Sequence, residues 1–146
     1  MSIEELRSIN KILLRLAKKL DLSKLSATEI DKYLDSRDQN PFDSDWSLAY
    51  KEVENQKNEF NEITLQKIEE LNEKLREAIF KNIIRITDSF DLAGYISDDF
   101  GLISDAFFIS SFKKSWIFGL FDCYLNMKLP SGIVPILERP NIKSKN

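Results

Sequence analysis

The carboxylates are the side chains whose spacing along the chain could form a metal-binding or catalytic site. Four of them lie close together along a predicted helix: Glu69, Glu70, Glu73 and Glu77. In helical bundles such spacing can hold two metal ions, but those sites also use a Glu-x-x-His motif, and the chain contains no histidine. Lysines and arginines alternate with these glutamates, so we interpret the row as surface ion pairs and expect neither a metal nor a cofactor.

Asp98 and Asp105 are a second candidate pair, since two carboxylates can share general acid–base work. The absence of histidine excludes Ser–His–Asp and Cys–His triads and the HExxH zinc motif. Cys123 is the only cysteine, which excludes an intrachain disulfide, and we expect it to be a small buried residue. No glycine-rich phosphate-binding motif is found either. We therefore expect a protein that is not an enzyme.

The composition indicates which elements must position these carboxylates. The chain has 146 residues with only four glycines and four prolines, fewer turn residues than an all-β protein needs. We predict an all-α, single-domain helical bundle over residues 1–137, with a frayed polar tail over residues 138–146. The acidic start of the chain is unlike a signal peptide, and no apolar run approaches the roughly 20 residues of a membrane span. We expect a soluble, cytoplasmic protein.

The first two predicted helices carry clear start signals. Ser2-x-x-Glu5 and Ser26-x-x-Glu29 fit capping boxes, and the second helix is expected over residues 27–36. The first helix has one apolar face and is otherwise basic. Its basic residues are Arg7, Lys11, Arg15, Lys18 and Lys19. We interpret them as a solvated outer face; a contact with an acidic partner, a membrane surface or nucleic acid is the alternative.

Residues 35–45 (DSRDQNPFDSD) are predicted to form a loop, because they combine four aspartates with an Asn-Pro step. Asp43 or Ser44 would cap the following helix. The aspartates are either solvated capping residues or an acidic contact loop with Asp35, Asp38 and Asp43 as its candidates.

Residues 45–88 contain neither glycine nor proline and show two apolar rows at roughly heptad spacing. The first row is Trp46, Val53, Phe60, Ile68 and Leu75, and the second is Tyr50, Ile63, Leu71, Ile79 and Ile86. Residues 55–61 (NQKNEFN) are poor helix formers, so one long helix and two shorter helices are both open.

Residues 97–130 hold a large share of the aromatic side chains. Gly94 is predicted to end the preceding helix and Ser97 to cap a new one, with one apolar half for the core. Asp98 and Asp105 fall on the other half together with Phe108 and Phe112. Either another element covers these two rings, or they form an aromatic contact surface for a partner.

The final predicted helix, residues 116–128, is apolar around most of its circumference and should be the core element. Gly119 would permit close approach of another helix. Ile133, Val134, Ile136 and Leu137 would then pack as an extended strap.

Charge is distributed unevenly. No lysine or arginine lies between Arg85 and Lys113, whereas that interval contains five aspartates. Together with residues 35–45 this gives two acidic regions, which would steer a basic partner. The net charge of −3 argues against a nucleic-acid binder.

Three stretches give the chain a family resemblance: residues 97–103 (SDDFGLI), 116–124 (WIFGLFDCY) and 128–132 (KLPSG). They resemble the small acidic helical immunity proteins encoded beside bacterial polymorphic or contact-dependent toxins. The resemblance covers the last third of the chain. It implies a protein partner, a basic and nuclease-like toxin domain whose active site is occluded, and no role for nucleic acid or membrane.

The candidate partner-binding residues are Asp98, Asp105, Phe108 and Phe112 first, and Asp35, Asp38 and Asp43 second. The alternative is a structural adaptor that self-associates as a coiled coil through residues 46–86. The oligomeric state is open in both hypotheses.

Overall fold

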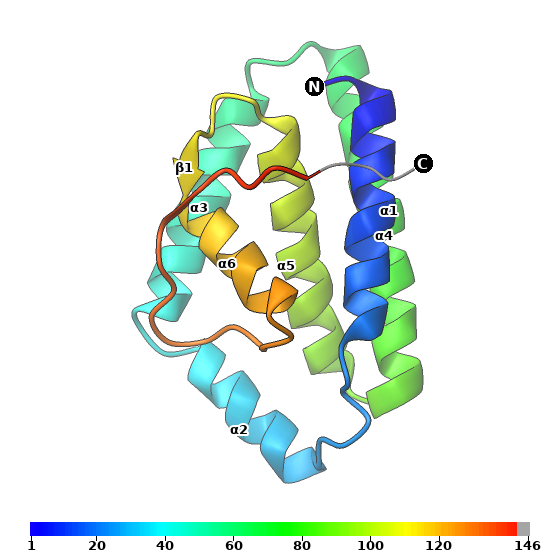
Figure 1. The fold of residues 1–146 in the computed structure, drawn as a ribbon, viewed down its shortest axis with the longest axis vertical. Helices are drawn as coiled ribbons and strands as arrows, with labels where there is room; N and C mark the ends of the chain where they lie inside the picture. The colour runs from blue at the N-terminus through cyan, green and yellow to red at the C-terminus, as the bar shows by residue number, and fades with distance from the viewer. Residues whose placement is uncertain (143–146) are drawn as a thin grey trace.

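The computed structural model describes residues 1–142 and consists of six helices with one two-stranded ribbon (Figure 1). The helices are α1 (Ile3–Lys19), α2 (Ala27–Arg37), α3 (Phe42–Lys57), α4 (Glu62–Thr87), α5 (Phe90–Phe108) and α6 (Trp116–Leu125). Strands β1 (Lys114–Ser115) and β2 (Leu137–Glu138) pair antiparallel, with Lys114 opposite Glu138. The predicted all-α bundle is confirmed. No helix within residues 1–142 is long and apolar enough to cross a bilayer.

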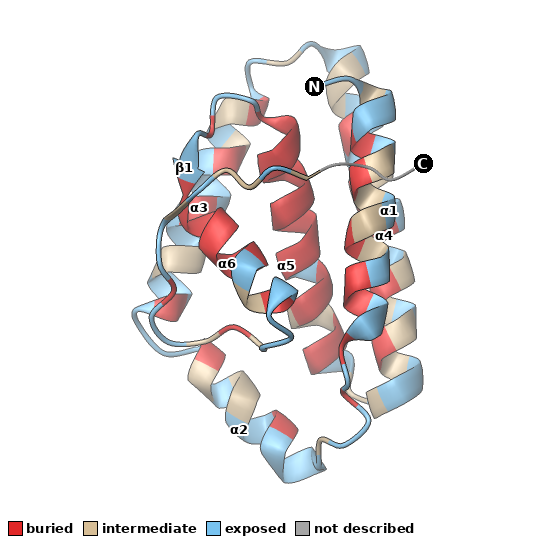
Figure 2. Cartoon of the chain, viewed as in Figure 1, coloured by how far each residue is buried: buried red, intermediate tan, exposed pale blue. Residues whose placement is uncertain are grey.

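Helix α5 is the central element of the bundle. Every residue from Ile96 to Phe108 is buried except Asp98, and α1, α3, α4 and α6 all pack against it (Figure 2). The half of this segment that carries Asp105 is therefore covered as well as the apolar half. The buried polar side chains on that half find partners on other helices: Ser104 donates to Asn10 of α1, and Asp105 pairs with Asn72 of α4 and Lys57 of α3.

The start of α5 also differs from the prediction. Ser89, not Ser97, is the N-cap, and its hydroxyl accepts a hydrogen bond from the amide of Leu92. Gly94 and Ser97 lie inside the helix. The chain reverses instead at Asp88, which adopts a left-handed conformation with φ of 57°. Aspartate tolerates this conformation better than most residues, so no glycine is required to end α4.

Residues 45–88 form two helices that run in opposite directions (Figure 1). The break lies at residues 58–61, inside the segment of poor helix formers, and the side chain of Asn61 caps α4. The first apolar row packs into the core, since Val53, Ile68 and Leu75 are buried. Ile63 of the second row is 70% exposed. The heptad spacing thus serves packing within the chain.

The first two helices start as predicted, since both capping boxes are formed. The predicted loop over residues 35–45 is wrong for most of its length: α2 continues to Arg37 and α3 begins at Phe42. The N-cap of α3 is Pro41, without a capping bond from Asp43 or Ser44. The side chain of Asn40 takes that role and accepts a hydrogen bond from the amide of Ser44 at 3.2 Å.

The predicted buried aromatic helix is α6, and the strap that follows packs differently from expectation. Val134 is buried, but Ile133 and Ile136 are 87% and 60% exposed. Gly119 does permit a close approach, although the neighbour is the strap and not a helix: a Cβ there would lie 1.8 Å from the carbonyl oxygen of Pro135.

Ordered contacts continue past the expected boundary at residue 137. The backbone amide of Arg139 donates to the carbonyl of Lys113, and its guanidinium binds the end of α5. The remainder of the expected frayed tail includes residues 143–146, which lie outside the described residues.

Candidate partner-binding surface

Three adjoining cavities form a continuous surface that we call the acidic trough. The first, of about 390 Å³, lies among α3, α4 and α5. The second, of about 160 Å³, shares Trp46 and Asp98 with the first. The third, of about 470 Å³, shares Asp38 and Tyr95 with the second. The trough therefore runs from the α3–α4 interface across α5 to α2.

Carboxylates dominate the lining of the acidic trough. They are Asp31, Asp35, Asp38, Asp43, Glu54, Glu69, Asp91, Asp98 and Asp105. These nine acidic side chains face three basic ones, namely Arg37, Lys57 and Arg76. The aromatic rings of Trp46, Tyr50 and Tyr95 lie between them. Such a surface is negative and also offers flat apolar faces for contact.

The structure brings all five predicted aspartates to this trough. Asp35, Asp38 and Asp43 are exposed, and the side chain of Asp98 is 57% exposed. Asp105 lines the first cavity but is buried, with 6% of its surface exposed. The charge pattern of the sequence predicted two acidic regions, and the structure places aspartates of both along this one trough.

Phe108 and Phe112 do not belong to the trough, because each is only 6% exposed. Phe108 packs on Phe60 with ring centroids 5.2 Å apart and joins a small cluster with Leu6 and Ile68. Cover by other elements is therefore the correct alternative, and the exposed aromatic contact surface is wrong. The aromatic rings of the trough are instead Trp46 and Tyr50 of α3 and Tyr95 of α5.

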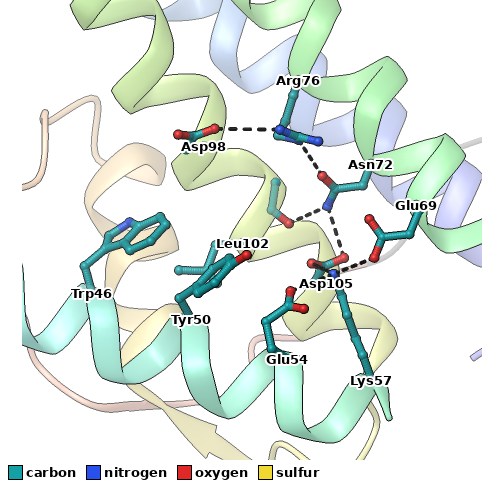
Figure 3. A pocket seen from close by; sticks show the side chains of 11 residues that line it. Trp46, Tyr50, Glu54, Lys57, Glu69, Asn72, Arg76, Asp98, Leu102 and Asp105 are labelled. Atoms are coloured by element: carbon teal, nitrogen blue, oxygen red, sulfur yellow. Dashed lines mark hydrogen bonds and ion pairs between the residues drawn. The ribbon is translucent and has the colours of Figure 1, made fainter. Parts of the chain in front are cut away.

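Lys57 and Asp105 form an ion pair at the base of the first cavity (Figure 3). The Lys57 Nζ lies 2.7 Å from Asp105 Oδ2 and 3.0 Å from Glu69 Oε1. Asn72 donates to Asp105 Oδ1 at 3.0 Å and to the carbonyl of Gly101 at 2.8 Å. Burial raises the pKa of Asp105 to about 6, against the opposing effect of Lys57. Burial disfavours the charge of Lys57 most strongly, but Asp105 and Glu69 together outweigh it and the pKa of Lys57 rises.

The solvent-accessible side chains of the first cavity lie along its walls. Trp46 and Tyr50 stack with centroids 5.6 Å apart and an interplanar angle of 11°. Asp98 stands on α5, where its nearest ion partner, Arg76 Nη1, is 3.8 Å away. Arg76 in turn donates to Asn72 at 2.7 Å. Burial raises the pKa of Asp98, and Arg76 lowers it less strongly.

A second network of buried hydrogen bonds lies beneath the trough and is centred on Asp99. Asp99 is completely buried and accepts two hydrogen bonds from Arg37, one from the indole of Trp46 and one from the hydroxyl of Tyr124. Burial disfavours the charge of Arg37, but Asp99 outweighs it and the pKa of Arg37 rises. The stacked ring of Trp46 is thereby fixed in position by a carboxylate of the core.

Four trough residues on α3 are absent from the predicted site, namely Trp46, Tyr50, Glu54 and Lys57, although Trp46 and Tyr50 were placed in the apolar rows. Their spacing of four, four and three residues places all four on one face of a helix, a signal that was available. Within residues 1–142, no group of three or more potential ligands is placed to hold a metal ion.

Fold and surface together define an all-α protein with an acidic, aromatic-lined trough. The family model described as Immunity protein PIM1 matches residues 11–131, and the chain belongs to this family of immunity proteins. A comparison with curated proteins and one with solved structures found no match. The resemblance to immunity proteins is confirmed, and it extends well beyond the last third of the chain.

Family membership assigns the protein to toxin immunity and implies that its partner is a protein, a toxin. It also suggests a non-enzymatic inhibitor.

Proposed function

We propose that this immunity protein neutralises its cognate toxin by binding it through the acidic trough and covering the toxin's active site. The observation that carries the proposal is the charge of this surface, with nine carboxylates against three basic side chains. Opposite charges accelerate encounter between proteins and suppress wrong partners, and aromatic side chains anchor such interfaces.

The charge of the trough favours a basic partner. Nuclease active sites bind phosphate backbones with lysine and arginine, so their surfaces attract a row of carboxylates spaced along a groove. Asp35, Asp38, Asp43 and Asp98 supply such a row on exposed positions. The cognate toxin is therefore a nuclease-like domain that the trough covers in place of nucleic acid.

The test uses the purified protein and the toxin domain encoded beside it. Binding is measured by calorimetry and stopped flow, and inhibition by the toxin's own activity. The double variant Asp38→Lys/Asp98→Lys should slow association by about tenfold or more at low salt, since it reverses two charges of the trough. The matched control is Asp122→Lys, a reversal at an exposed position on α6 outside the trough.

A competition experiment tests separately whether the protein covers the toxin's active site. A substrate analogue that fills the toxin's active site should compete with the immunity protein for the toxin. Unchanged association and inhibition by the double variant would contradict the role of the trough. Binding without competition would contradict occlusion and leave the trough as the interface.

The self-association hypothesis gains no support from the geometry. Val53, Ile68 and Leu75 of the first apolar row are already buried inside the chain. The exposed residues of the second row, Tyr50, Ile63 and Ile86, are interrupted by Leu71 and Ile79, which other elements cover at least in part. Light scattering on a size-exclusion column should therefore give the mass of a monomer.

A further inference from the structure

The first cavity of the trough combines a stacked pair of aromatic rings with an exposed carboxylate. Trp46 and Tyr50 present a nearly parallel pair of rings from α3, and Asp98 lines the same space from α5 (Figure 3). Tyr50 is 47% exposed, so part of the aromatic surface is open to a partner. Aromatic faces beside a carboxylate are the environment that binds an organic cation.

Asp98 has unused capacity to accept hydrogen bonds. Its contact with Arg76, at 3.8 Å, is longer than a hydrogen bond. Asp105 at the base of the cavity differs, because Lys57 and Asn72 both donate to it at 3.0 Å or less. At the bottom of the cavity, Asp105 therefore has its hydrogen-bond partners, whereas Asp98 at the wall is incompletely paired.

We propose that this cavity receives a single arginine side chain of the toxin, with its guanidinium against the Trp46–Tyr50 rings and paired with Asp98. The proposal rests on the proposed function, because the arginine belongs to the toxin that the trough binds. A cavity of about 390 Å³ lies near the lower end of the roughly 300–1,000 Å³ usual for small ligands, so it suits one side chain and not a helix.

Arginine fits this cavity better than lysine. Its guanidinium is planar, stacks on aromatic rings and donates two parallel hydrogen bonds to a carboxylate. A lysine ammonium is a compact and strongly hydrated charge that would lose more hydration energy on entering the cavity.

The ring of Trp46 is already fixed in position in the free protein. The indole nitrogen of Trp46 donates to Asp99 at 2.9 Å, and Arg37 holds that carboxylate from the other side. A ring that is already fixed loses little conformational entropy on binding, so more of the contact energy appears as affinity.

The chain contains two tryptophans, which provide a built-in comparison. Trp46 lines the cavity, whereas Trp116 is buried at the start of α6. In ¹⁵N–¹H spectra, titration with N-acetyl-arginine-amide should shift the Trp46 indole signal in a saturable way and leave Trp116 unchanged. N-acetyl-lysine-amide should produce a clearly smaller shift. An unmoved Trp46 signal, or equal shifts with both compounds, would overturn the arginine site.

Two variants connect the spectra with the interface. Asp98→Asn keeps the shape of the side chain and should abolish the arginine-dependent shift, whereas Asp122→Asn on α6 should retain it. Tyr50→Ala should weaken both the shift and toxin binding. A shift that survives in Asp98→Asn also overturns the proposal.

The two proposals fail in different ways. If toxin inhibition depends on the trough charges but arginine does not move Trp46, the arginine site alone is wrong. If arginine binds at Trp46 but the toxin does not bind the protein, the proposed function is wrong.

Discussion

Arg37 and Asp99 form a two-pronged ion pair inside the protein. Both contacts, from Nη1 to Oδ2 and from Nη2 to Oδ1, measure 2.8 Å, and the side chains are 6% and 0% exposed. Trp46 and Tyr124 donate to the same carboxylate, so α2, α3, α5 and α6 meet at one buried charge. Removing one member leaves the others with unpaired polar groups in a dry environment.

We expect Asp99→Leu to lower the free energy of unfolding by about 3–5 kcal/mol, because the guanidinium of Arg37 then lies buried without a counter-charge. Arg37→Met should cost a similar amount. The double variant should cost clearly less than the sum, since it removes both charges. Urea denaturation of the four proteins measures this coupling, and strictly additive losses would contradict it.

The pKa of Asp105 predicts a pH dependence of stability. Because burial raises it from 3.8 to about 6, the folded protein binds a proton in this interval that the unfolded chain does not bind. The contribution of Asp105 to stability is therefore greatest below pH 3.8 and falls as the pH rises to about 6.

Asp105→Asn removes this titration and keeps an acceptor for Asn72. The melting temperature of the wild-type protein relative to this variant should decline as the pH rises through that interval. A constant difference would contradict the raised pKa. Glu77→Gln, on an exposed ion pair of α4, is the control, since its exposed pair should contribute little.

Arg139 completes the end of α5. Its guanidinium donates to the carbonyls of Ala106, Phe107, Ile109 and Phe112 at distances between 2.6 and 3.0 Å. They lie at and just beyond the C-terminus of α5, where carbonyls lack partners within the helix and a positive charge is favourable.

We expect Arg139→Ala to cost about 3 kcal/mol in urea denaturation, because several hydrogen bonds to a charged group are lost together. Arg139→Lys should recover only part of the loss, since one ammonium cannot reach all four carbonyls. Arg15→Ala, an exposed arginine on α1, is the matched control and should change stability by less than about 0.5 kcal/mol. Equal effects at both positions would show that Arg139 does not cap α5.

Two glycines inside helices should respond to alanine with opposite signs. At Gly94 an added Cβ meets no atom within 4 Å, so Gly94→Ala should stabilise the protein by about 0.5–1 kcal/mol through the unfolded state. At Gly119 the Cβ would lie 1.8 Å from the carbonyl oxygen of Pro135. Gly119→Ala should lower the melting temperature and displace the strap. Stabilisation at both positions would contradict the close approach of the strap.

The sequence predicted correctly those features that depend on residues close together in the chain. Both capping boxes and the apolar face of α1 depend on residues within one or two turns, and the structure contains them as predicted. The break in residues 45–88 falls where helix propensity is poor, although propensity alone left the alternative of one helix open.

Distant partners explain what the sequence analysis missed in α5. Asp99 was not considered as a core residue, and Asp105 was placed on the polar half of an amphipathic helix. Their partners Arg37 and Asn72 lie 62 and 33 residues away, respectively, so no local pattern reveals that these carboxylates are buried. The same reason applies to the tail, where Arg139 reaches α5 across about 30 residues.

The sequence predicted the acidic residues of the candidate surface but did not predict its aromatic residues. The five aspartates chosen from the charge pattern all line the trough, because acidic residues without nearby cations gather on one surface. Phe108 and Phe112 were chosen because the helical wheel placed them on the polar half, with cover by another element left open as the alternative. Whether a ring is exposed depends on tertiary packing, which the wheel does not contain.

Asp98 and Asp99 are neighbours in the chain, yet the first faces the trough and the second lies at the centre of the core. This arrangement has an evolutionary consequence. Substitutions at Asp98 can alter which toxin is recognised while the fold stays intact, whereas Asp99 is constrained by four hydrogen bonds from three partner residues. We expect descendants of this chain to diverge in toxin specificity through the exposed carboxylates of the trough, with the buried ion pair inherited unchanged.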